Sequence, residues 1–265
     1  MKYYIVDAFT DNVFKGNQAA VYFPENGWPS DEFMTNLCRE NNFSDIAILL
    51  KKEGGYDLRW FTQSGEIEFC GHASIAASYV VLNYEEPGSN EVHFDSMHGH
   101  IVVTKSNGFI NMQLETYDLE KVEVTDEMVE ATGCDVRPIE AWKARDLVLV
   151  YEDESVVRNM VPDQEKVMKL DGLLVHVTAP GKDYDCVSRS FAPKCNVVED
   201  PVCGSGHCHI IPYWAKRLGK NDVKAFQASE RSGVLYGHYE GNEFFISGHA
   251  AVFAKGEAVN EDMSF

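Results

Sequence analysis

Basic residues are scarce in this chain of 265 residues, where 23 Lys and Arg stand against 42 Asp and Glu and the formal net charge is −19. Such a charge repels nucleic acid and anionic membranes. Long apolar runs are also missing, since no segment approaches the roughly 20 apolar residues that cross a bilayer. The first residues lack the apolar core of a signal peptide. We therefore expect a cytoplasmic protein that binds neither nucleic acid nor membrane.

The signatures of nucleotide cofactors and of serine hydrolases are absent, namely the Gly-x-Gly-x-x-Gly turn, the Walker loop and the Gly-x-Ser-x-Gly elbow. Seven cysteines, an odd number without regular spacing, indicate reduced thiols rather than a disulfide framework. One short stretch contains four residues of the types that bind zinc, namely Cys203, His207, Cys208 and His209. Their spacing matches no standard zinc site. We expect no metal and no nucleotide cofactor.

Two stretches of the sequence show the same succession of elements: a strand, a loop, a Cys-Gly pair and then an apolar run. The first run, from Cys70 to Val81, contains no charged residue, which predicts a helix that is buried nearly all round. A second buried helix is expected from about 205 to 218. This order predicts an internal duplication. The repeated motifs are Arg59-Trp60-Phe61-Thr62 with Cys70-Gly71-His72, and Arg189-Ser190-Phe191-Ala192 with Cys203-Gly204-Ser205.

The beginnings of these two helices can carry chemistry. The first turn of a helix presents unpaired N–H groups and a partial positive charge, which suit a bound carboxylate. A thiol placed there is expected to have a lowered pKa. Two such cysteines, Cys70 and Cys203, could remove a proton from one face of a carbon and return it on the other, as in a racemase or epimerase. The alternative is that each is an ordinary buried cysteine that packs as a small hydrophobe.

Other polar residues near these motifs are further candidates. Asp45 precedes a predicted strand and, with His72 at the helix start, would form a general acid/base pair. The alternatives are a turn or capping residue for Asp45 and a hydrogen-bonded structural histidine for His72. Asp200 either binds a substrate amine, orients a base, or is a polar loop residue ahead of Pro201. Ser205 either caps its helix or binds a carboxylate.

Six motifs together resemble the phenazine-biosynthesis PhzF-like family, which belongs to the diaminopimelate-epimerase-like superfamily. The resemblance extends over nearly the whole chain, in the order of the family. The motifs are Asp7-Ala8-Phe9-Thr10, Phe14-Lys15-Gly16-Asn17-Gln18-Ala19-Ala20-Val21, Arg59-Trp60-Phe61-Thr62, Phe69-Cys70-Gly71-His72-Ala73, Ser188-Arg189-Ser190-Phe191-Ala192-Pro193 and Glu199-Asp200-Pro201-Val202-Cys203-Gly204-Ser205.

The resemblance implies a diaminopimelate-epimerase-like α+β fold. In that fold two pseudo-symmetric halves each wrap a curved, mostly antiparallel sheet around a central helix, and the substrate binds in the cleft between the domains. We expect a first half at 1–115 and a second half at 116–247, with a C-terminal strand at about 248–265 that returns to the first. The resemblance also implies a homodimer, as in many members, and no metal or organic cofactor.

The chemistry that the resemblance implies is proton transfer at an activated carbon. In the PhzF type the acid/base residue is the Glu of a Ser-Glu motif, and Asp45 in Ser44-Asp45 matches it here. The resemblance implies that the backbone N–H groups around Gly71 and Gly204 hold a carboxylate of the substrate. The loop that contains Asn17 would shape the substrate pocket. The expected catalytic residues are Asp45, His72, Asp200, Cys70 and Cys203, and the expected substrate-binding residues are Gly71, Gly204, Ser205 and Asn17.

Two departures from the family pattern keep three functions open. Asp45 is one methylene shorter than the family's Glu, and Cys203 replaces its usual Thr, which gives the two-cysteine pattern of the superfamily's racemases. The preferred hypothesis is a biosynthetic, cofactor-independent isomerase of a small carboxylate or amino-acid-like molecule. The second is an amino-acid racemase or epimerase that uses Cys70 and Cys203. The third is a catalytically degenerate ligand-binding protein.

Overall fold

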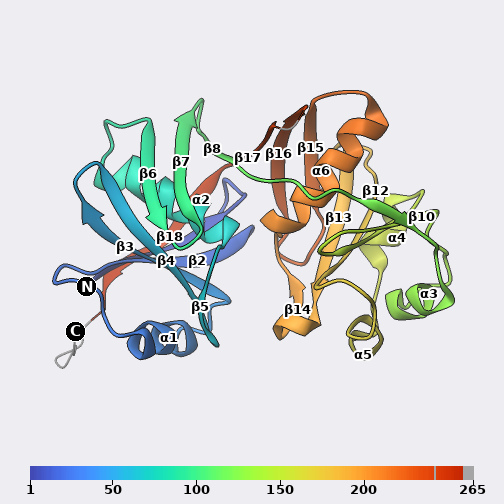
Figure 1. Ribbon diagram of the computed structural model, residues 1–265, viewed down its shortest axis with the longest axis horizontal. Helices are drawn as coiled ribbons and strands as arrows, with labels where there is room; N and C mark the ends of the chain where they lie inside the picture. Colours follow the sequence, from blue (N-terminus) through green and yellow to red (C-terminus); the bar gives the residue numbers. More distant parts are fainter. Residues whose placement is uncertain (242, 259–265) are drawn as a thin grey trace. The chain divides into compact units, whose positions relative to one another are not determined.

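The computed structural model describes residues 1–241 and 243–258, which form two compact units (Figure 1). The first unit contains Met1–Gln113 together with the chain from Ser247 onward, and the second contains Leu114–Ile246. Residues 259–265 of the expected returning segment lie outside the described residues. Over the described ranges, no helix is long and apolar enough to cross a membrane.

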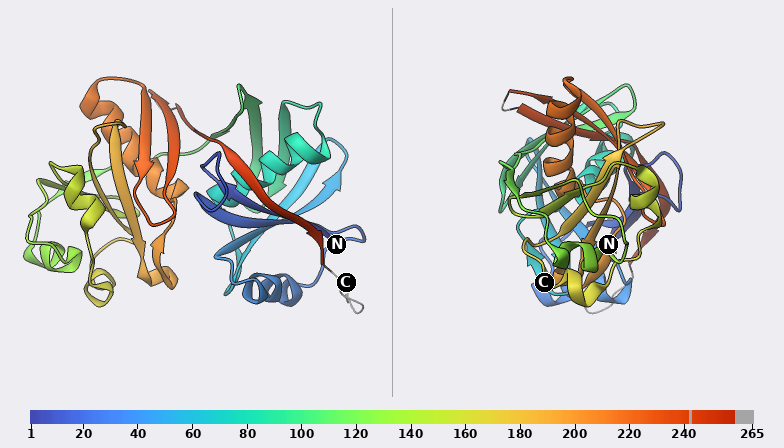
Figure 2. Two further views of the ribbon diagram at one scale, coloured as in Figure 1. Left: turned by 180° about the vertical axis from the view of Figure 1, so that it is seen from behind. Right: turned by 90° about the vertical axis from the view of Figure 1, so that its right-hand side faces the viewer.

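The first unit is a mixed sheet folded around one helix. Strand β18 pairs antiparallel with β1, with Lys2 opposite Glu257, so the last strand lies along the first (Figure 2). The strands β1, β2, β3 and β4 are neighbours in that order, and only β2 and β3 are parallel. The strands are β1 (Lys2–Ala8), β2 (Asn17–Phe23), β3 (Asp45–Lys52), β4 (Gly55–Thr62), β5 (Gly65–Ile67), β6 (Glu91–Ser96), β7 (Gly99–Ser106), β8 (Phe109–Gln113) and β18 (Ala250–Glu257).

Helix α2 (Gly71–Val80) is the central helix of this unit and continues as a π-helical turn, Val81–Glu85. Its apolar side chains are fully buried, and it packs against β1, β2, β3, β8 and β18. Its buried hydroxyls on Ser74 and Ser78 donate to the carbonyls four residues earlier, at 2.7 Å each, so they are not left unpaired. The prediction of a buried helix here is confirmed. The other helix of the unit, α1 (Asp31–Glu40), is capped by Ser30.

The second unit repeats this plan around α6 (Gly204–Leu218), which packs against β15 and β16. Its strands are β9 (Glu120–Val122), β10 (Glu140–Lys143), β11 (Leu147–Val150), β12 (Val175–Pro180), β13 (Cys186–Ala192), β14 (Val197–Asp200), β15 (Asp222–Gln227) and β16 (Gly233–Glu240), and β17 (Glu243–Gly248) leads back to the first unit. Three short helices, α3 (Asp126–Thr132), α4 (Glu154–Asn159) and α5 (Gln164–Val167), and a 3₁₀ turn at Pro193–Cys195 complete it.

The repeated arginine makes the same local structure in each unit. On β4, Arg59 forms a two-pronged ion pair with Glu66, at 2.7 and 2.6 Å, and its guanidinium lies 5.0 Å from the ring centre of Phe61. On β13, Arg189 pairs with Glu199 at 2.8 Å twice and lies 5.1 Å from the ring centre of Phe191. Each pair ties a long strand to the short strand that leads into a Cys-Gly motif, which supports an internal duplication.

Candidate active site

Three predicted catalytic residues meet in the first unit, at the beginning of α2. Asp45 opens β3, Cys70 is the residue before the first turn of α2, and His72 lies in that turn. The Nε2 atom of His72 is 3.7 Å from Oδ2 of Asp45, and its Nδ1 atom is 3.5 Å from Sγ of Cys70. The side chain of Asp45 is 16% exposed and that of His72 is 8% exposed. An acid, an imidazole and a thiol therefore lie together in one nearly buried cluster, in which the carboxylate of Asp45 is more exposed than the imidazole of His72.

Asn17 begins the strand next to the one that Asp45 begins. Because β2 and β3 are parallel, with Ala20 opposite Ile46, both residues lie at the same edge of the sheet. The loop before Asn17 is held in a fixed shape, since Asp7 accepts a hydrogen bond from the backbone N–H of Phe14 at 2.9 Å. Gly16 has a φ of +67°, and a Cβ there would lie 2.1 Å from the Ala8 carbonyl oxygen, so only glycine fits.

The second motif positions its cysteine differently. Cys203 is 2% exposed, and its Sγ accepts a hydrogen bond from the Gly206 N–H at 3.3 Å, so it caps α6. Its own N–H donates to Gln227, whose amide donates in turn to the Asp200 carbonyl. Burial, assisted by the nearby carboxylate of Asp200, raises the pKa of the Cys203 thiol well above its usual value. The expected lowering of this pKa is wrong, because loss of hydration outweighs the helix terminus.

Ser205 is held by a polar network that the sequence did not reveal. Arg145 donates to the Ser205 hydroxyl at 2.9 Å and forms a two-pronged pair with Asp146 at 3.1 and 2.5 Å. Asp146 is fully buried and also contacts Nε2 of His176 at 3.1 Å, while Nδ1 of His176 contacts the Ser190 hydroxyl at 2.9 Å. Burial alone would raise the pKa of Asp146, but the hydrogen bonds from His176 and Arg145 outweigh it and hold that pKa well below its usual range.

Asp200 has a local structural contact of its own. Its Oδ1 atom accepts a hydrogen bond from the Val202 N–H at 3.1 Å, as expected of a turn residue ahead of proline. The turn before α6 and the first turn of that helix thus contain four of the predicted site residues, all within the second unit: Asp200, Cys203, Gly204 and Ser205. Their catalytic and binding roles stay predictions.

The two histidines of α6 are structural. Nδ1 of His207 donates to the Cys203 carbonyl at 2.7 Å and its Nε2 contacts the Ser188 hydroxyl at 3.2 Å. The ring of His209 stacks on Tyr117 with centres 4.2 Å apart. Burial lowers the pKa of each to about 4, so both rings are neutral at pH 7.

Two groups of side chains among the described residues offer three donor atoms within 4.8 Å of one another, as a metal ion would require. In the group Asp146, His176 and His209, the carboxylate already binds the guanidinium of Arg145, whose charge opposes a cation. The other group is Asp45, Cys70 and His72, and its oxygen, sulfur and nitrogen donors also fit an acid/base role. The expectation of no metal here stays a prediction.

Gly206 is the position in this network where no side chain fits. A Cβ there would lie 2.5 Å from Cε1 of His176, a buried ring that Asp146 and Ser190 hold from both nitrogens. We expect Gly206→Ala to lower the free energy of unfolding by about 1–3 kcal/mol through overpacking, measured by urea titration. The control is Gly88→Ala, where nothing lies within 4 Å of the added Cβ. Equal stability of the two variants would contradict the close approach.

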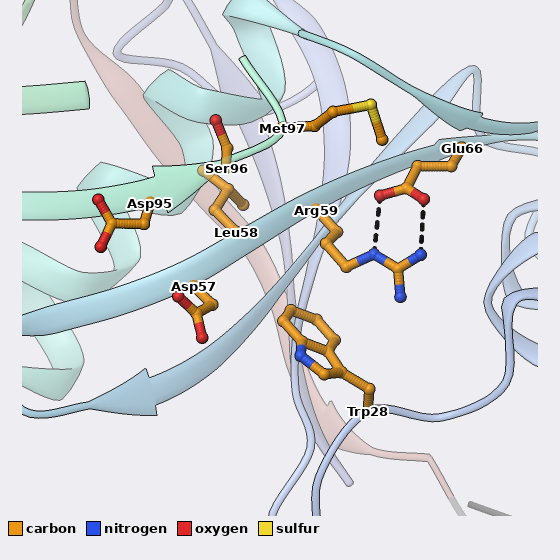
Figure 3. Close-up of a pocket in the computed structure, with 8 residues that line it drawn as sticks. All are labelled: Trp28, Asp57, Leu58, Arg59, Glu66, Asp95, Ser96 and Met97. Atoms are coloured by element: carbon orange, nitrogen blue, oxygen red, sulfur yellow. Dashed lines mark hydrogen bonds and ion pairs between the residues drawn. The ribbon is translucent and has the colours of Figure 1, made fainter. Parts of the chain in front are cut away.

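An open surface pocket of the first unit lies apart from these groups. It has a volume of about 430 Å³ and is lined by Trp28, Asp57, Leu58, Arg59, Glu66, Asp95, Ser96 and Met97 (Figure 3). The ion pair between Arg59 and Glu66 occupies one side of it (Figure 3). None of Asp45, Cys70 and His72 lines it, so the candidate site rests on the chemistry of its groups rather than on this cavity.

A sheet wrapped around a buried helix that begins at a Cys-Gly pair, present once in each unit, is typical of the α+β fold of epimerases and racemases. The chain belongs to the phenazine biosynthesis-like PhzC-PhzF family, whose model matches residues 6–256. It is 38% identical to a protein of Pseudomonas aeruginosa named an uncharacterized isomerase, over 97% of each chain. A crystal structure of a PhzF-family protein from Enterococcus faecalis superposes with a TM-score of 0.94, at 42% identity over 98% of this chain and 99% of that one.

The fold likeness extends to more distant proteins. A probable proline racemase from Agrobacterium radiobacter has a TM-score of 0.67 at 11% identity, over 98% of this chain and 93% of that chain. At that identity the likeness shows the fold alone. The predicted family and fold class are confirmed, and relatives of this chain carry the name isomerase.

Proposed function

We propose that this protein is a cofactor-independent isomerase of the PhzF type, which transfers a proton at a carbon of a small carboxylate or amino-acid-like substrate. The observation that carries the proposal is the meeting of Asp45, His72 and Cys70 at the first turn of α2. The partial exposure of the Asp45 side chain leaves it open to a substrate, while His72 is almost enclosed.

In the proposed reaction, the carboxylate of Asp45 removes a proton from an activated carbon and returns it to another carbon. One C–H bond breaks and another forms, so the substrate is isomerised without gain or loss of electrons. The N–H groups at the first turn of α2, including that of Gly71, stabilise the negative charge on the substrate's carboxylate. His72 lies beside Asp45 and assists the proton transfer. For the second unit, the family resemblance supports anion binding at Ser205 and amine binding at Asp200 as part of the proposal.

An amino-acid racemase is the second candidate function. It is favoured by the contact of 3.5 Å between the Cys70 thiol and Nδ1 of His72, an arrangement that activates a thiol at a helix start. The weaker partner in such a mechanism is Cys203. Its thiol is enclosed and engaged as a cap, and its raised pKa keeps it protonated, so that little thiolate is available to remove a proton.

Exchange of carbon-bound hydrogen tests the proposal. The protein is incubated in D₂O with amino acids and their cyclic and hydroxylated derivatives, and deuterium at carbon is measured by NMR. We expect incorporation into at least one compound, and the exchange should persist after dialysis against a chelator. No exchange over a broad panel would instead support a ligand-binding protein.

Replacing one thiol separates the two enzymatic candidates. We expect Cys203→Ser to keep exchange within a few-fold of the unmodified protein, because a hydroxyl can replace the thiol as a helix cap. The matched control is Cys186→Ser, which alters another fully buried thiol of the same unit. If exchange is lost in Cys203→Ser while the control keeps both its fold and its exchange, the racemase mechanism is preferred.

A further inference from the structure

The hairpin of β6 and β7 carries two histidines on its exposed face. Along β6 the side chains alternate, with Val92 and Phe94 buried and Glu91, His93 and Asp95 directed outward. The register places Val102 opposite His93 and His100 opposite Asp95. His93 and His100 are therefore diagonal neighbours across the two strands, close enough for their rings to touch.

The two imidazoles face each other through one nitrogen each. Nδ1 of His93 lies 3.1 Å from Nε2 of His100. The other nitrogen of each ring contacts a carboxylate at 2.7 Å, Glu91 for His93 and Asp95 for His100. This arrangement, with a carboxylate behind each imidazole, is the one that usually orients metal-binding histidines.

The positions of the ring hydrogens follow from these contacts. An ionised carboxylate only accepts hydrogen bonds, so the nitrogen that faces it carries the hydrogen. A neutral imidazole has a single N–H, which leaves a lone pair on both of the facing nitrogens. Two lone pairs at 3.1 Å repel unless a cation lies between them, and that cation is either one extra proton or a metal ion.

The distance between these nitrogens fits a transition metal. Bonds of about 2.0–2.1 Å at a tetrahedral angle place two ligand nitrogens about 3.3 Å apart, and square-planar geometry places them about 2.9 Å apart. The surroundings keep a net negative charge that favours a dication. The ammonium of Lys52, which opposes one, pairs with Asp95 and Asp57, and these two carboxylates together with Glu91 outnumber it.

We propose that His93 and His100 form a surface site for a divalent late transition metal such as Zn²⁺ or Ni²⁺, with water in the remaining positions. The site differs from the metal-free expectation drawn from the sequence. It involves neither Asp45 nor His72, so it stands independently of the proposed isomerase activity. The side chains of His93 and His100 are 40% and 53% exposed, so an ion can reach them without any opening of the fold.

Zinc titration of the tag-free, chelator-dialysed chain tests the site by calorimetry. We expect one Zn²⁺ per chain, with binding weakened at least tenfold in His93→Gln and in His100→Gln. Glu91→Gln removes the carboxylate that orients His93. It should weaken zinc binding about tenfold, which is the lower end of the effect usually seen when a carboxylate behind a metal-binding histidine is replaced. Because these side chains are exposed, the variants should keep the unmodified protein's melting temperature without metal.

The matched control is His238→Gln. His238 is similarly exposed and lies 2.7 Å from Asp222 and 3.7 Å from Glu240, but these partners are carboxylates rather than a second imidazole. Its replacement should leave zinc binding unchanged. The proposal is overturned if the chain takes up no zinc, or if His93→Gln binds as tightly as the unmodified protein. The proposal is also overturned if zinc binding is abolished by His72→Gln and by none of the other substitutions, because the ion would then bind beside Asp45.

Discussion

Replacing Asp45 with Asn should slow carbon–hydrogen exchange by about 10²–10⁴-fold, the usual contribution of a general acid/base group. The amide keeps the shape of the side chain but can neither take up a proton nor carry the negative charge that faces His72 at 3.7 Å. The measurement is the rate of deuterium incorporation into whichever substrate the panel identifies. Because Asp45 reaches the surface, the melting temperature should change by no more than a few degrees.

The control for this loss is Asp45→Glu, which keeps an ionisable group and moves it by one methylene. Misplacement by about an ångström can cost up to ~10²-fold in rate, so this variant should lose less than Asp45→Asn. If Asp45→Asn keeps full activity, Asp45 is not the acid/base group. The contact between Cys70 and His72 would then make Cys70 the next residue to replace.

The first half of the candidate site was predictable because its information is local. An uncharged run predicts a buried helix, and the polar residues directly before such a run must lie at its beginning. Cys70 and His72 therefore meet there. Asp45 joins them through the sheet, since it opens a strand next to β2 and β4. The pairing of Asp45 with His72 was a hypothesis from residue types, to which the family resemblance added the match of Ser44-Asp45; no spacing along the chain predicted it.

The network behind Ser205 was not predictable, since its members are far apart in sequence. Asp146 precedes β11, His176 lies on β12 and Ser205 begins α6, and the parallel register of β11 and β12 brings them together. Its one local signal was a charged pair, Arg145 and Asp146, directly before an apolar strand. The chemical state of Cys203 was missed for a related reason, because burial of a helix start depends on the whole unit rather than on the motif.

The two Cys-Gly motifs are therefore alike in backbone and different in chemistry. In the first, the histidine contacts both the thiol and a partly exposed carboxylate. In the second, the thiol caps the helix, and the nearby buried carboxylate, Asp146, is neutralised by Arg145. The proposed acid/base chemistry therefore rests on the first motif, while the contacts of the second motif are those of a helix cap and a buried ion pair.

The stability of the second unit should depend strongly on Asp146. Its carboxylate is fully buried and accepts hydrogen bonds from Arg145, His176 and the backbone N–H of Leu174. Removing one partner of a buried ion pair typically costs about 3–5 kcal/mol. We expect the lower end of that range for Asp146→Asn in urea unfolding at pH 7, because the Arg145 side chain is 32% exposed and can regain water.

The pH dependence of stability tests whether the charge of the Asp146 carboxylate causes the loss of stability in Asp146→Asn. The pKa of Asp146 is lower in the folded protein than in the unfolded chain, where it is about 3.9. The charge therefore contributes its full stability above about pH 4, and that contribution is lost as the pH falls further. The stability difference between the unmodified protein and Asp146→Asn should narrow below pH 4. Asp222→Asn, at a side chain that is 86% exposed, should have little effect at any pH. A difference for Asp146→Asn that stays constant from pH 7 to pH 3 would show that the lost hydrogen-bond acceptor, and not the charge, makes Asp146 necessary.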